Sequence, residues 1–395
     1  MIPSVRRSVV LLAVLVTAAA LPLSAQPQRA RDLGIPFPGT PGPWNAITDV
    51  PGVEVGYTTL IEGDGPLVPG KGPVRTGVTV ILPRGKAETR LPAGWFSLNG
   101  DGELTGIPFI QDYGTLTGPI GITNTNSVGI VRDAVGEWCY RNFSTGEAVD
   151  FSFGLPVVGE TWDGDLNDIN GYHVRKEHVF AALDGAASGP IAEGNVGGGT
   201  GMWLYGFKGG TGTASRLVPV GDTTYTLGVL AQCNFGERED LLVAGIPVGR
   251  EITNLQPVLY DPHQDGSVIV VVATDAPLLP SQLTHLARRV TMGLARTGSI
   301  ARNGSGDIFV AFSTAEPAYD STWTYMTMTT LVKWHLDPLF SATVEAVEEA
   351  VINALIAAET MTGVNGNTLY AMPEERLVAI LRKYNRIADP GRGED

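Results

Sequence analysis

Short runs of β-branched and other apolar residues, bounded by turns rich in glycine and proline, recur along most of the chain. The most continuous run, SVIVVVAT at residues 267–274, contains five consecutive β-branched residues. Such a run is typical of a strand that is buried on both faces. Residues 307–312 predict a partner strand for it. Further strands are predicted at residues 78–82, 120–125 and 225–231.

Helical periodicity is strongest in the C-terminal third of the chain, where it predicts helices at residues 280–295 and 340–355. In the second of these, apolar residues recur every three or four positions and acidic residues occupy the other face. The apolar residues are Phe340, Val344, Val347, Val351 and Leu355, and the acidic ones are Glu345, Glu348 and Glu349. A last helix is expected to start at Pro373. Strands and helices are interspersed, which predicts an α/β or α+β fold with substantial buried sheet.

The first 25 residues have the layout of a secretory signal peptide. Arg6 and Arg7 precede an apolar run at residues 9–20, and residues 23–25 offer a small-residue cleavage site. The run is shorter than the ~20 residues that a membrane anchor needs. We therefore expect a periplasmic or secreted protein that begins near Gln26 and has no membrane contact after the signal is removed.

Composition excludes several classes of protein. The 395 residues carry a net charge of −14, which argues against a nucleic-acid partner, and their 43% hydrophobic content argues against disorder. The two cysteines, Cys139 and Cys233, are too few for a disulfide framework, and no CxxC motif indicates zinc.

Three motifs resemble known sites without matching them. Residues 65–72 (GPLVPGKG) lack the serine or threonine that follows the lysine of a phosphate loop, so a surface loop is expected. The glycine-rich segment at residues 194–201 is not a dinucleotide fingerprint; a packing turn and a wall of a ligand site both remain open. His173 and His178 lie five residues apart, which on a helix points them about 140° apart, so solvated helix residues are expected rather than metal ligands.

A serine stands directly at the start of the strongest predicted strand, in the sequence Asp265-Gly266-Ser267. Attack of the Ser267 hydroxyl on the Gly266 carbonyl, followed by hydrolysis of the ester, would leave Ser267 with a free α-amine. An α-amine with a pKa of about 7.7–8.0 can accept the proton of the hydroxyl without any histidine. The alternative interpretation of these residues by themselves is an ordinary turn before a strand.

The surrounding sequence favours the first interpretation. Over residues 29–314 the chain resembles the DmpA-type aminopeptidases, which include the β-peptidyl aminopeptidases (peptidase family S58). The similar stretches lie at residues 30–56, 156–168, 178–186, 192–201, 227–236, 266–283 and 303–314, with a further one at 357–363. The resemblance implies a four-layer αββα sandwich, similar in its layers to the N-terminal-nucleophile hydrolases. It also implies one catalytic domain cut into residues 26–266 and 267–395, a homotetramer, and no metal or organic cofactor.

The same resemblance assigns roles to individual residues. Ser267 corresponds to the nucleophile, and Ser305 and Asp307 to the residues that orient it and its amine. Asn234 corresponds to the oxyanion-hole side chain and Glu160 to the carboxylate that binds the substrate's free amino group. Trp162 is expected at the substrate-binding site; some members of the family carry tyrosine there, whose hydroxyl an indole cannot replace in stabilising the acyl transition state.

The expected activity is therefore that of a serine aminopeptidase acting on small peptides, amino-acid amides or esters with a free amine. The preference among L-α, D-α and β-residues is left open. Two alternatives are an acyl transferase resembling ornithine acetyltransferase and an inactive binding protein of the same fold.

Overall fold

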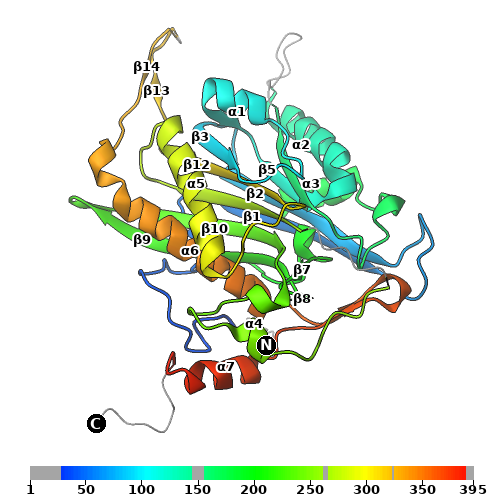
Figure 1. Ribbon diagram of the computed structural model, residues 1–395. Coiled ribbons are helices and arrows are strands. Elements are labelled where there is room, and N and C mark those ends of the chain that lie inside the picture. Colours follow the sequence, from blue (N-terminus) through cyan, green and yellow to red (C-terminus); the bar gives the residue numbers. More distant parts are fainter. Residues whose placement is uncertain (1–27, 145–154, 261–265, 323, 388–395) are drawn as a thin grey trace, which may run out of the picture.

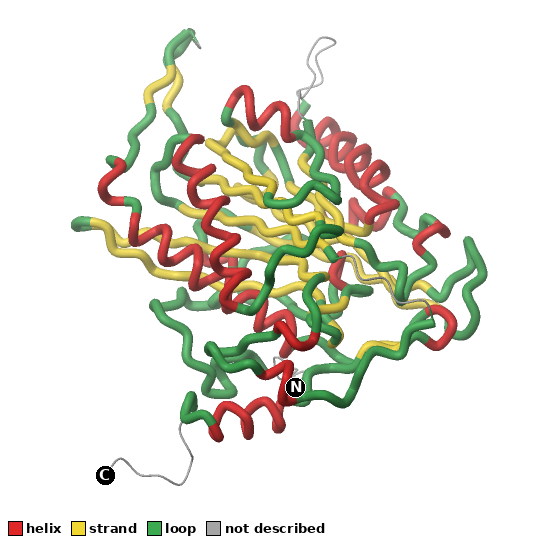
Figure 2. Tube along the Cα trace, viewed as in Figure 1, coloured by secondary structure: helices red, strands yellow, loops and turns green. Residues whose placement is uncertain are grey.

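Two β-sheets lie face to face at the centre of the computed structural model, which describes residues 28–144, 155–260, 266–322 and 324–387 (Figures 1 and 2). The larger sheet has the strand order β4-β3-β12-β11-β10-β9 and the smaller one β1-β2-β5-β6. The strands of the larger sheet are β3 (Arg90–Ser97), β4 (Thr115–Thr117), β9 (Gly210–Val220), β10 (Thr223–Asn234), β11 (Ser267–Thr274) and β12 (Gly306–Ser313). Those of the smaller sheet are β1 (Glu54–Glu62), β2 (Val74–Lys86), β5 (Ile120–Asn124) and β6 (Val157–Thr161).

Helices cover the outer face of each sheet. The helices are α1 (Ile107–Tyr113), α2 (Val128–Phe143), α3 (Lys176–Asp184), α4 (Val248–Glu251), α5 (Pro280–Arg296), α6 (Asp337–Ile356) and α7 (Glu374–Lys383). Three two-stranded ribbons complete the fold: β7 (Trp203–Leu204) with β8 (Phe207–Lys208), β13 (Ala318–Tyr319) with β14 (Met326–Thr327), and β15 (Met361–Thr362) with β16 (Thr368–Leu369).

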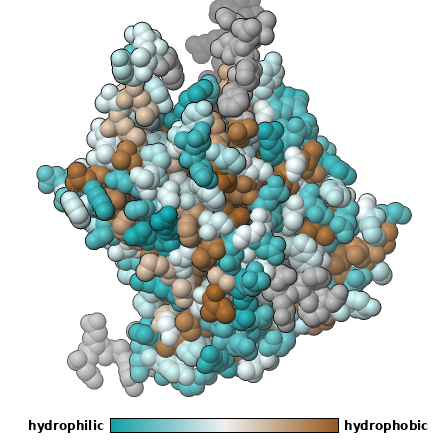
Figure 3. Space-filling view, turned by 45° about the horizontal axis from the view of Figure 1, so that its top comes forward, coloured by the Kyte–Doolittle hydropathy of each residue, from teal (hydrophilic) through white to brown (hydrophobic). Residues whose placement is uncertain are grey.

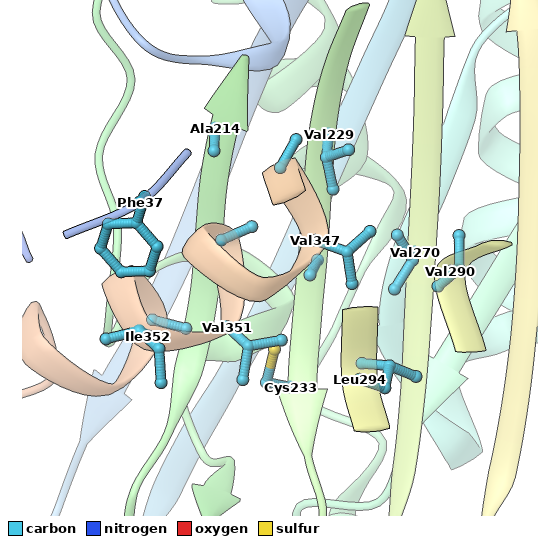
Figure 4. Close-up of a cluster of buried hydrophobic side chains, with 14 of the residues drawn as sticks. Phe37, Ala214, Val229, Cys233, Val270, Val290, Leu294, Val347, Val351 and Ile352 are labelled. Atoms are coloured by element: carbon cyan, nitrogen blue, oxygen red, sulfur yellow. The ribbon is translucent and has the colours of Figure 1, made fainter. Parts of the chain in front are cut away.

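Three separate apolar cores hold these layers together. In the first, α5 and α6 pack on the larger sheet, as Val290 and Val351 illustrate (Figure 4). The second lies between the two sheets and includes Ile122 and Val271. The third joins the smaller sheet to α2 and α3. The order helix, sheet, sheet, helix is the αββα sandwich that the resemblance implied, and this expectation is confirmed.

Alternation explains why β11 can be buried on both sides. Val268, Val270 and Val272 face the helices, whereas Ile269 and Val271 face the other sheet. β11 pairs in parallel with β12 and antiparallel with β10, which sets Ser267 between Asn234 and Gly306. The predicted strand 267–274 and its predicted partner are therefore correct, and they fix the position of the candidate nucleophile.

The acidic face of α6 is partly covered by other segments of the chain. Glu349 is fully buried, and Arg31 and Asn45 of the N-terminal segment donate hydrogen bonds to its carboxylate. Its carboxylate pairs with Arg31 at 2.7 Å and with Arg216 at 2.8 Å. Such a buried charge is tolerated because both partners are cationic and hydrogen-bonded.

The set-aside motifs have structural roles. The loop at residues 65–71 is exposed, as expected. Gly198, in the glycine-rich segment, lies so close to Gln232 that a Cβ would stand 2.2 Å from its Oε1, which identifies a packing turn. The prediction for His173 is wrong: it precedes α3 rather than lying on it, and its Nε2 contacts Asp168 Oδ2 at 2.9 Å.

The predicted last helix begins at Glu374, directly after Pro373. Among the described residues, no helix has both the length and the apolar character needed to cross a bilayer. The signal peptide predicted at residues 1–25 lies outside the described residues.

Candidate active site

A cavity of about 290 Å³ opens at the end of β11 where Ser267 stands. Strand ends from both sheets meet there: Ser267 begins β11, Glu160 lies near the end of β6, and Thr125 follows β5. The lining residues are Asp101, Gly102, Glu103, Thr125, Glu160, Trp162, Gly266, Ser267 and Gly304. The site is thus built between the two sheets, from segments that are far apart in the sequence.

The peptide bond between Gly266 and Ser267 is held by its neighbours on both sides. The Gly306 N–H donates a hydrogen bond of 3.1 Å to the Gly266 carbonyl oxygen. On the other side, a Cβ on Gly266 would lie 2.6 Å from the Asn234 carbonyl oxygen and 2.8 Å from Phe235 Cα. Only glycine fits this position without a shift of the backbone, because the end of β10 and Phe235 approach it so closely.

Ser305 and Asp307 lie beside this peptide, at the start of β12. Ser305 Oγ donates to Asp307 Oδ1 at 2.6 Å, and Asn99 Nδ2 donates to Asp307 Oδ2 at 3.3 Å. Burial raises the pKa of the Asp307 carboxyl, and these two donors counteract part of that effect. Neither residue lines the cavity, so the pair forms a support next to Ser267.

Asn234 is the register partner of Ser267 on β10 and is fully buried. Its Oδ1 accepts the Trp203 N–H at 3.0 Å, and its Nδ2 donates to the Trp162 carbonyl at 3.0 Å. These bonds fix the orientation of the amide. Because an amide nitrogen carries two hydrogens, one N–H is left that can stabilise an oxyanion.

Glu160 is a buried acidic residue in the lining of the cavity, with only 3% of the residue exposed. Its Oε1 accepts the Glu103 N–H at 3.0 Å, and its Oε2 accepts the Thr125 hydroxyl. Burial raises the pKa of Glu160, the two hydrogen bonds lower it, and the charges of Glu103 and Asp101 raise it further. A buried anion of this kind is a suitable partner for an ammonium group.

Trp162 forms a wall shared by two cavities. It lines the cavity of Ser267 and a second one of about 190 Å³, on the side of Asp168 and Tyr260. Its ring lies over Gly164, where a Cβ would approach within 2.3 Å. The structure therefore gives Trp162 a steric role in bounding the site.

The structure brings together all the residues proposed from the sequence. Ser267, Gly266, Glu160 and Trp162 line one cavity, and Asn234, Ser305 and Asp307 flank it. The sequence analysis missed Asp101, Glu103 and Asn99, which come from a loop without a distinctive pattern, and Thr125, which directly follows β5. Within the described ranges, no group of three or more His, Cys, Asp or Glu side chains could hold a metal ion.

Comparison with known proteins identifies the family. The sequence profile of Peptidase family S58 matches residues 45–369. The chain belongs to peptidase family S58. The match spans both sides of Ser267 and includes the lining residues of the cavity.

Individual S58 relatives are similar over nearly their whole length. The chain is 53% identical to beta-peptidyl aminopeptidase BapA of Sphingosinicella microcystinivorans, with 92% of this chain and 94% of the relative covered. It is 46% identical to the protein of the same name from Sphingosinicella xenopeptidilytica, over 94% and 95% of the two chains. Among solved structures, the L-aminopeptidase D-Ala-esterase/amidase of Ochrobactrum anthropi shares 47% identity and a TM-score of 0.85, over 91% of this chain and 99% of that one.

That structure is described as a prototype for the serine aminopeptidases and a new variant among the Ntn hydrolase fold. Together with the family match, it shows that this S58 peptidase is a hydrolase of the serine aminopeptidase class. The expected family, fold and enzyme class are confirmed.

Proposed function

We propose that the protein is an exported, self-processing aminopeptidase that releases N-terminal residues through an acyl-enzyme on Ser267. The observation that carries this proposal is the shared cavity of Ser267 and Glu160. Its lining offers both a nucleophile and a buried anion for the substrate's ammonium. A cavity of about 290 Å³ has room for one amino-acid residue.

The first step is the conversion of one chain into two. The Ser267 hydroxyl adds to the Gly266 carbonyl carbon, whose oxygen is polarised by the Gly306 N–H. The bond from carbon to the Ser267 nitrogen then breaks as the nitrogen gains a proton, which leaves an ester on the Ser267 oxygen. Water hydrolyses the ester, giving a carboxylate at Gly266 and a free α-amine at Ser267. The products are the segments 26–266 and 267–395.

The second step is turnover of substrate. The neutral α-amine of Ser267 accepts the hydroxyl proton as the oxygen attacks the substrate carbonyl. The Asn234 amide stabilises the oxyanion, a contribution of ~10²–10³ in rate where one such donor has been removed from another enzyme. The proton passes to the departing amine or alcohol, and water then hydrolyses the acyl-enzyme. In this scheme Asp307, whose carboxylate is held by the Ser305 hydroxyl, orients the amine.

The substrate class follows from the anion at Glu160. Its two oxygens are held by Glu103 and Thr125, so the carboxylate cannot turn away from the cavity. A peptide, amide or ester with a free N-terminal amine fits this arrangement, whereas an acylated amine carries no charge. The names of the relatives include β-peptidyl and L-amino-acid substrates, and D-alanyl esters and amides. We propose the same range of residues here.

Export and assembly are further parts of the proposal. The first 25 residues support export to the periplasm or outside the cell. The β13–β14 hairpin projects from the sandwich (Figure 1), and the exposed side chains of Tyr325, Met326 and Trp334 lie in and just after it. On the face shown in Figure 3, hydrophobic side chains gather in several separate patches. These features support an assembly in which such surfaces are covered, and the family resemblance suggests that it is a tetramer.

The substrate end can be tested with paired anilides that differ only in acetylation of the amine. We expect turnover of the free-amine substrate alone. Glu160→Gln is expected to lower kcat/KM for that substrate by a factor that corresponds to a loss of about 1.5–3 kcal/mol in transition-state stabilisation, the range for a charged hydrogen bond. Glu375→Gln, an exposed change on α7, serves as the control. Equal rates on free and acetylated substrates would exclude Glu160 from amine binding.

A further inference from the structure

The cavity of Ser267 carries more negative charge than one ammonium group neutralises. Besides the buried Glu160, two exposed acidic residues, Asp101 and Glu103, line its rim. None of the described residues that line this cavity is basic. When a substrate's amine has paired with Glu160, the acidic residues Asp101 and Glu103 are still left in the lining of the cavity.

The rim is held in place rather than being part of a loose loop. Asn99 Nδ2 donates to the carbonyls of Ala301 and Arg302 at 3.0 Å each, which anchors the start of the segment. A Cβ on Gly102 would lie 3.0 Å from Gly306 Cα and 3.1 Å from Glu160 Oε1. The backbone between the two acidic residues is therefore packed directly against the catalytic strands.

The charges of the rim act on the amine-binding group. The Glu103 N–H bonds to Glu160 Oε1 at 3.0 Å, so the side chain of Glu103 starts next to that carboxylate. Although burial is the main reason that the pKa of Glu160 is raised, Glu103 and Asp101 raise it further. The same field acts on any charge that a substrate brings into the cavity.

We propose that Asp101 and Glu103 select the side chain of the substrate's N-terminal residue by charge, favouring cationic residues and disfavouring acidic ones. This inference rests on the proposed function, because it assumes that the N-terminal residue occupies this cavity with its amine at Glu160. Lysine and arginine, in α- or β-form, carry the cation on a stem long enough to reach the rim. Aspartate and glutamate meet repulsion from both rim carboxylates.

The test compares anilides of lysine, glutamine and glutamate, which have similar lengths and different charges, made with whichever backbone the enzyme accepts. We expect kcat/KM to fall in the order lysine, glutamine, glutamate. Each exposed ion pair contributes about two- to fivefold, so the lysine-to-glutamate ratio should reach about tenfold or more at low ionic strength. It should shrink as salt is added, because salt screens exposed charges.

Variants locate the source of the preference. Asp101→Asn and Glu103→Gln should each reduce the lysine-to-glutamate ratio of kcat/KM. In the double variant, only the difference in shape between the two side chains should remain, without the effect of charge. Glu375→Gln should keep the wild-type ratio. A double variant with an unchanged lysine-to-glutamate ratio would overturn the inference. Turnover of the glutamine anilide in the same experiment would still support the proposed function. Failure of all three anilides would contradict the proposed function instead, and this inference with it.

Discussion

Three carboxyl groups in or next to the site, Glu160, Asp163 and Asp307, are buried, and burial raises the pKa of each. For Glu160 and Asp307, hydrogen-bond donors hold the carboxylate in one orientation, which suits groups that must face an amine. A sequence reveals that an acidic residue is present, but it does not reveal its burial. The roles of Glu160 and Asp307 could therefore be proposed only through the family resemblance, and Asp163 was not noticed at all.

The general base is tested by the dependence of activity on pH. If the α-amine of Ser267 must be neutral, kcat/KM should rise with pH through the pKa of that amine. Model amines titrate at about 7.7–8.0. Burial lowers this value and an ionised Asp307 raises it, so we expect the rise between about pH 6.5 and 8.5.

Histidine is the competing base in this range, with an ordinary pKa near 6.5. The five histidines are His173, His178, His263, His285 and His335. The structure describes all of them except His263, and none of those four lines the cavity. Each His→Gln change should therefore leave the rise in place. Loss of both the activity and the rise in one of these variants would identify a histidine base and remove the α-amine from the mechanism.

Asp163 predicts a second pH effect, this time on stability. Burial raises the pKa of this carboxyl from 3.8 to about 7. A raised pKa means that the folded state prefers the protonated acid, so the stabilisation is complete below pH 3.8 and is lost as pH rises through 7. Asp163→Asn cannot ionise, and its amide oxygen can still accept the bond from Asn167 Nδ2.

The melting temperature of Asp163→Asn should therefore exceed that of the wild type by more at pH 8 than at pH 5. Each pKa unit corresponds to about 1.4 kcal/mol. The gain in the free energy of unfolding of Asp163→Asn over the wild type should therefore be larger at pH 8 than at pH 5 by at least about 1 kcal/mol. Thermal unfolding followed by circular dichroism at both pH values measures it. A difference that does not depend on pH would show that Asp163 does not titrate on folding.

At the scale of elements, the sequence predicted those parts of the fold whose pattern is local. Five consecutive β-branched residues gave the bounds of β11, and the periodicity of residues 340–355 located α6. The order of the strands depends on contacts distant in sequence, so pattern alone could not supply it. Glu349 shows the same limit: its position on α6 was clear, but the segment that covers it lies more than 300 residues away.

The packing of β10 against Gly266 gives a prediction at this scale. Gly266→Ala places a Cβ within 2.6 Å of the Asn234 carbonyl oxygen, so the peptide before Ser267 must shift. We expect processing to slow by at least tenfold, as measured by the disappearance of the single chain on a denaturing gel. Gly129→Ala on α2 meets no atom within 4 Å and should be processed at the wild-type rate. Equal rates for both variants would mean that the alignment of this peptide does not limit cleavage.

At the scale of the whole molecule, the proposed cut runs through the middle of the larger sheet. β11 and β12 of the smaller piece lie between β10 and β3 of the larger piece, and they bond to both. The two pieces therefore share all the hydrogen bonds of these strand pairs and the two cores on either side. After cleavage they should stay together as one catalytic domain and separate only when the protein is unfolded.

The central claim is that Ser267 becomes an N-terminal nucleophile by self-cleavage, and an intact-mass measurement under denaturing conditions tests it most directly. For purified wild type, the claim predicts two species, residues 26–266 and residues 267–395, that co-elute under native conditions. It predicts a single species for Ser267→Ala, without aminopeptidase activity. A wild-type protein that remains one chain and is fully active would contradict the account.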